Sequence, residues 1–104
     1  MEPSKADSRK LRELAGDVYE ADVHRLLMQL DQQFDAWRTG TLASSELLQG
    51  IHEFHQGESR ALWSMYQGLK PDMVVERGLA FNLISEDKIP EPLRAKLTPE
   101  TWRP

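Results

Sequence analysis

The feature that most constrains this fold is a long run of regularly spaced apolar residues in the first part of the chain. They recur mostly in steps of three and four, which places them along one side of an α-helix. The run consists of Leu11, Ala15, Val18, Tyr19, Val23, Leu26, Leu30, Phe34 and Trp37. No proline interrupts it, and Gly40 follows where a left-handed residue can end a helix. The pattern therefore predicts an amphipathic helix over about residues 8–39.

A helix of roughly 30 residues would be about 45 Å long, at about 1.5 Å per residue. This length exceeds the width of a domain built from a 104-residue chain. We therefore expect part of the apolar side to pack against another chain or against a folded-back C-terminal half. Large aromatic residues fill the corners between helices, but tryptophan and tyrosine also anchor interfaces. The residues predicted for interaction are Tyr19, Val23, Leu26, Leu30, Phe34, Trp37, Trp63 and Tyr66.

The rest of the chain predicts an all-α fold of four to five helices. The shorter helices are expected over about residues 44–56, 58–69, 71–85 and 91–97. The first should carry Leu47, Leu48, Ile51 and Phe54 on one face and stop near Gly57, whereas Pro71 suits the first turn of a later helix. We predict a disordered N-terminus over residues 1–7, a single helical domain over 8–97 and an irregular tail over 98–104.

Composition excludes several classes of function. The net charge is -4 and the 13 basic residues are scattered among 17 acidic ones, so nucleic acid is not expected as a partner. Apolar runs are far shorter than the ~20 residues needed to span a bilayer, and no secretory signal is evident. We therefore expect a cytoplasmic protein without a membrane partner. The chain has no cysteine, which removes disulfides, thiolate ligands and cysteine nucleophiles.

The window from Asp35 to Glu46 resembles an EF-hand loop, with Asp35 first, Gly40 sixth and Glu46 twelfth. The third, fifth and ninth positions are Trp37, Thr39 and Ala43, which leaves too few oxygen ligands for calcium. The window therefore predicts a degenerate loop without calcium, in which Gly40 turns the chain between two helices.

Two histidines, His52 and His55, lie one helical turn apart and are the candidate metal ligands of the chain. They do not form the H-E-x-x-H pattern of zinc hydrolases, and the sequence nominates no third ligand. We expect His55 to be partly buried beside the apolar face and His52 to lie at its rim. Neither a metal nor another cofactor is predicted.

One block of sequence resembles a known family. Phe34-Asp35-x-Trp37-Arg38-x-Gly40-x-Leu42, Glu46-Leu47, Ile51-His52-Glu53-Phe54-His55-x-Gly57 and Leu62-Trp63 are similar to a family of small uncharacterised bacterial helical proteins. The resemblance covers roughly residues 10 to 97. It implies a bacterial, helical, cytosolic protein and transfers no catalytic residue.

Three functional hypotheses remain open at this point. The first is a noncatalytic helical module for protein interactions, whose partner is either an unidentified protein or a second copy. The second is an acidic, antitoxin-like partner of a basic bacterial protein, which the net charge of -4 permits. The third is a metal-dependent protein that uses His52 and His55. No serine or glycine motif marks an enzyme, so catalysis is not expected.

Overall fold

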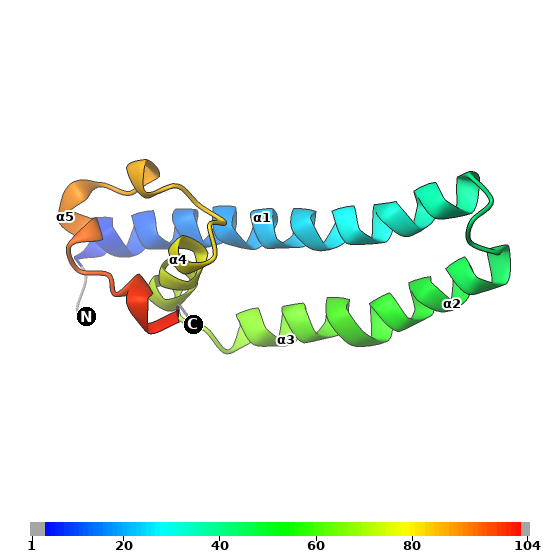
Figure 1. The fold of residues 1–104 in the computed structure, drawn as a ribbon. Coiled ribbons are helices and arrows are strands. Elements are labelled where there is room, and N and C mark those ends of the chain that lie inside the picture. Colours follow the sequence, from blue (N-terminus) through cyan, green and yellow to red (C-terminus); the bar gives the residue numbers. More distant parts are fainter. Residues whose placement is uncertain (1–3, 103–104) are drawn as a thin grey trace. The chain divides into compact units, whose positions relative to one another are not determined.

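The structure is a computed structural model that describes residues 4–102. Within that range the regular elements are helices and turns, without a strand, which confirms the all-α prediction. A long N-terminal helix precedes several shorter ones, as expected (Figure 1). The α-helices are α1 (Lys5–Arg38), α2 (Ser44–Phe54), α3 (Arg60–Gln67), α4 (Pro71–Ala80) and α5 (Glu91–Arg94). None of the helices in this range is long and apolar enough to cross a bilayer.

Helix α1 begins three residues earlier than its apolar pattern predicts. The Asp7 backbone N–H donates to Ser4 Oγ over 3.1 Å, so Ser4 satisfies one of the amides that a helix start leaves unpaired. Residues 5–7 of the predicted disordered segment are therefore helical, and residues 1–3 lie outside the described residues. Gly16 does not break the helix.

Helices α2 and α3 are not separated by a break near Gly57. They are joined by a π-helical turn, η1 (His55–Ser59), in which the backbone stays helical and absorbs an extra residue. The residues on either side of η1, Phe54 and Arg60, keep right-handed helical dihedral angles. The two predicted helices thus form one continuous arm.

Helix α4 begins with Pro71 in its first turn, as predicted, but it ends at Ala80 and not near residue 85. The cause is Asn82, whose φ of 59° lies in the left-handed region, and the Leu83 amide closes the helix end by donating to the Gly78 carbonyl at 2.8 Å. Further along, residues 99–102 of the predicted irregular tail form a short 3-10 helix, η3 (Pro99–Trp102). Residues 103–104 lie outside the described residues.

The chain divides into two compact units. Unit 1 combines the chain up to Asp22 with the chain from Leu69 onward, and it holds a well-buried apolar core. The core side chains are Leu11, Leu14, Val18, Val74, Val75, Leu79, Ile84, Ile89, Leu93 and Leu97. The start of α1 contacts α4 closely, because Gly78 leaves room for Val18 against its backbone. Burial of these side chains is the main source of stability in unit 1.

Unit 2 spans Val23–Gly68 and is a helical hairpin. The second half of α1 leads through a tight corner into α2, η1 and α3, which run back beside it (Figure 1). The helices approach closely at Gly50, where an added Cβ would meet the side chain of Gln33. Among the described residues, Leu47 is the single fully buried hydrophobic side chain of this unit. The seam of the hairpin is therefore only half-buried.

Candidate interaction surface

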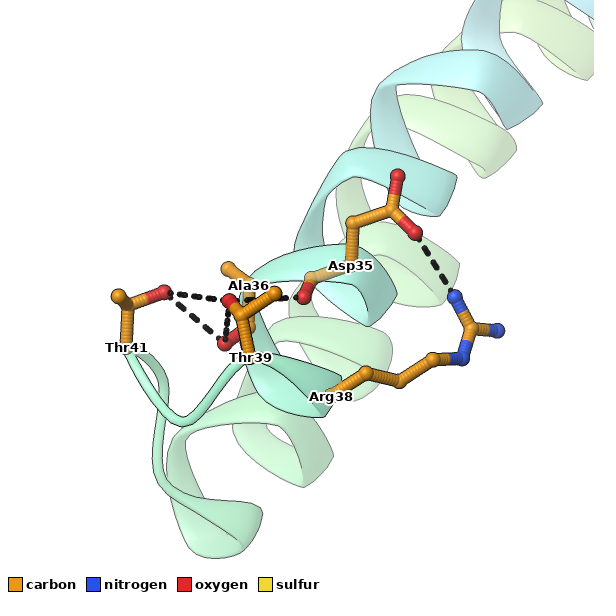
Figure 2. Close-up of polar contacts among 5 residues, drawn as sticks. All are labelled: Asp35, Ala36, Arg38, Thr39 and Thr41. Carbon is orange, nitrogen blue, oxygen red and sulfur yellow. Dashed lines mark hydrogen bonds and ion pairs between the residues drawn. The ribbon is translucent and has the colours of Figure 1, made fainter.

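The corner between α1 and α2 is closed by its own hydrogen bonds (Figure 2). Thr41 Oγ1 donates to the Ala36 carbonyl at 2.9 Å, and Thr39 Oγ1 donates to the Asp35 carbonyl at 3.1 Å. Gly40 has a φ of 84°, so it supplies the left-handed residue that the sequence predicts here. The corner is a capped helix end that fixes the direction of the returning arm.

The two carboxylates that would begin and end a calcium loop already have other partners. Asp35 accepts a hydrogen bond from Arg38 at 2.9 Å, as Figure 2 shows. Glu46 Oε1 accepts from the Ala43 backbone N–H at 3.1 Å and thereby caps the start of α2. These contacts agree with the prediction that the EF-hand-like window serves as a structural corner.

The predicted interaction residues on α1 are divided between the two units, because Tyr19 belongs to unit 1 and the others to unit 2. Five of them are half-buried: Tyr19, Val23, Leu26, Leu30 and Phe34. Trp37 is 40% exposed, but its indole N–H donates to Ser44 Oγ at 2.9 Å and ties α1 to α2. Tyr66 is half-buried and takes part in a noncovalent interaction within the protein, whereas Trp63 is 58% exposed. The most accessible of the predicted anchors is therefore Trp63.

Leu48 is the exposed apolar residue that the sequence pattern missed. The pattern placed it on the inner face beside Leu47, but successive helical residues point about 100° apart, and in this helix Leu47 turns inward while Leu48 turns outward. Leu47 is buried at 5% exposure and Leu48 is 70% exposed. On the α1 side of the hairpin, Leu27 and Met28 are each 50% exposed.

Leu48 and Trp63 belong to one continuous outer strip of the returning arm. One hollow is lined in part by Leu48, His52 and His55, and a second hollow in part by His55, Ser59 and Trp63. Because the hollows share His55, they form a single surface along α2, η1 and α3. We name it the α2–α3 stripe, and its residues in chain order are Ser45, Leu48, His52, His55, Ser59 and Trp63.

Both histidines of the stripe are exposed, so the expectation that His55 is partly buried is wrong. The π-helical turn starts at His55 and changes the spacing along the arm, which an ideal helical period does not anticipate. Within residues 4–102, neither imidazole has a hydrogen bond or an ion pair. Both rings line the same hollow, and their nitrogen atoms are available to an external group.

The stripe carries little charge. Among the described residues, those that line the two hollows include one charged side chain, Arg60, and no carboxylate. This neutrality contrasts with the chain as a whole, which has a net charge of -4. Two stripes would therefore approach each other without strong electrostatic repulsion.

Fold and surface together define an all-α protein whose hairpin unit presents an apolar, histidine-bearing face. Comparison with known proteins adds no relative: no family model, no curated protein and no solved structure matches the chain.

Proposed function

We propose that the protein is a noncatalytic helical interaction module that self-associates through the α2–α3 stripe. The observation that carries the proposal is the exposure of Leu48 at 70% and of Trp63 at 58% on one face of the hairpin. Large apolar side chains that are exposed on a neutral surface are typical of protein interfaces.

The order of residues along the stripe favours a second copy as the occupant. Two copies that run antiparallel, with a two-fold axis between His52 and His55, would place Leu48 of each copy at the level of Ser59 of the other. Trp63 would lie at the level of Ser44 in the same way, next to Ser45 of the stripe. Each large side chain therefore faces a small one, which is the complementarity that a two-fold interface requires. Two hairpins joined in this way would make a four-helix arrangement.

A basic protein partner suits this surface less well. A surface that recognises basic proteins needs carboxylates, whereas the charged side chain among the described residues lining the stripe hollows is Arg60. In the antiparallel pair, the two Arg60 side chains fall on opposite sides of the two-fold axis and are kept apart.

Substitution of Leu48 and Trp63 by glutamine is expected to abolish most of the self-association. Both side chains are exposed, so the fold should tolerate the change. Each residue occurs twice in the dimer, and a buried apolar anchor contributes about 1–2 kcal/mol or more, so the dimer dissociation constant should rise at least about a hundredfold. Light scattering over a concentration series measures this constant.

The matched control is the Leu27→Gln, Met28→Gln double variant. Those two residues are each 50% exposed on α1 and lie outside the stripe. The control should change the dissociation constant by less than about tenfold, because substitutions outside an interface core have small effects on binding. A control that weakens the dimer as much as the stripe variant, or a wild-type protein that stays monomeric, would contradict the proposal.

A further inference from the structure

The two histidines of the stripe have no function in the packing of a single chain. His52 and His55 are exposed, have no polar partner within residues 4–102, and line one hollow. Apolar contact alone does not need them, because any small neutral side chain would leave Leu48 and Trp63 free to pack. Their position between Leu48 and Trp63 on the stripe is therefore the feature that still requires an explanation.

One chain offers only half of a metal site. Imidazoles one helical turn apart can ligate the same transition metal, but zinc in a closed site takes four ligands. Within residues 4–102, no group of three histidine or acidic side chains lies close enough together to hold a metal ion. The described part of the chain therefore supplies neither a third nor a fourth ligand beside the two histidines.

The antiparallel pair supplies those ligands. A two-fold axis between His52 and His55 places His52 of one copy at the level of His55 of the other, so four imidazoles gather around the axis. Four neutral nitrogen donors suit a tetrahedral divalent transition metal such as zinc, and they do not suit magnesium or calcium, which prefer oxygen.

We propose that His52 and His55 from two copies bind one zinc ion at the centre of the self-association interface. The inference rests on the proposed self-association, because neither chain completes the site alone. The metal would act as a clamp that joins the two hairpins and fixes their antiparallel register. No catalytic step is assigned to it.

The test uses the untagged protein, dialysed against a chelator, with and without ZnCl2. We expect about one zinc bound per two chains by titration calorimetry and elemental analysis. Zinc should lower the dimer dissociation constant by about tenfold or more, which is the usual size of coupling between two binding events. The same concentration of MgCl2 should leave the constant unchanged.

The control is the His52→Ala, His55→Ala double variant, which removes only exposed side chains. It should bind no stoichiometric zinc and should dimerise equally with and without the metal. If the wild-type protein dimerises with the same dissociation constant with and without zinc, the zinc site is wrong and the proposed self-association stands. A protein that is monomeric under both conditions would overturn both, and one zinc bound per single chain would overturn the shared site.

Discussion

Replacement of Leu14 by alanine is expected to lower the free energy of unfolding by about 2–5 kcal/mol, which is the largest effect among the variants considered. Leu14 is 2% exposed and is among the largest fully buried side chains of unit 1. The substitution removes apolar contacts and leaves a cavity that the surrounding helices fill only in part. Urea unfolding followed by far-ultraviolet circular dichroism, at one fixed protein concentration, measures the loss.

The control for Leu14 is Leu27→Ala, which changes the same residue type on the same helix. Leu27 is 50% exposed, so its truncation should cost less than about 1 kcal/mol. The fixed concentration matters because self-association adds to the apparent stability of both proteins. Equal losses in the two variants would show that the buried face of α1 differs from the one described.

Replacement of Gly78 by alanine is expected to destabilise the protein by about 1–3 kcal/mol, although alanine is the better helix former. A Cβ at this position of α4 would lie 2.5 Å from Cγ2 and 2.9 Å from Cγ1 of Val18. Val18 is fully buried and β-branched, so it has little freedom to move aside. Thermal unfolding provides the measurement.

Gly16→Ala is the matched control, because Gly16 is also a glycine within an α-helix. No heavy atom lies within 4 Å of an added Cβ at Gly16. Its substitution should therefore stabilise the protein by about 1 kcal/mol through helix propensity alone. If Gly78→Ala raised the melting temperature as Gly16→Ala should, the close approach of α1 to α4 would be disproved.

The fold could be predicted from the sequence where a local pattern of residues strongly favours one backbone structure. The spacing from Leu11 to Trp37, with no proline inside it, favours one long helix, and the structure has that helix. Gly40 and Pro71 occupy the positions where a left-handed residue and a fixed φ are favoured. Each of these signals depends on neighbours in sequence and needs no knowledge of tertiary contacts.

The ends of other helices depend on local backbone conformations that the pattern of apolar residues does not predict. Gly57 was expected to end a helix, but a π-helical turn carries the chain through it without a break. The end of α4 depends on Asn82, because a left-handed asparagine there closes the helix several residues before the apolar pattern stops. Both outcomes follow from local hydrogen bonding that competes closely with a regular α-helix.

The candidate surface was predicted only in part. Trp63 was named as an anchor, and His52 and His55 were named as the candidate ligands, because their residue types alone suggest these roles. Leu48 was missed because a run of two leucines fits either neighbouring face, and the packing of Leu47 decides which one turns inward. The continuity of the stripe across η1 also depends on the π-helical turn.

The most direct test of the self-association is oxidative cross-linking. The sequence has no cysteine, so each disulfide that forms must join introduced cysteines. A Leu48→Cys variant is mixed with a Ser59→Cys variant, and the disulfide-linked products are identified by mass spectrometry. The antiparallel stripe predicts that position 48 of one chain joins position 59 of the other, as the main product of the mixture. A mixture that remains monomeric on a non-reducing gel, or one that links only 48 to 48 and 59 to 59, would contradict it.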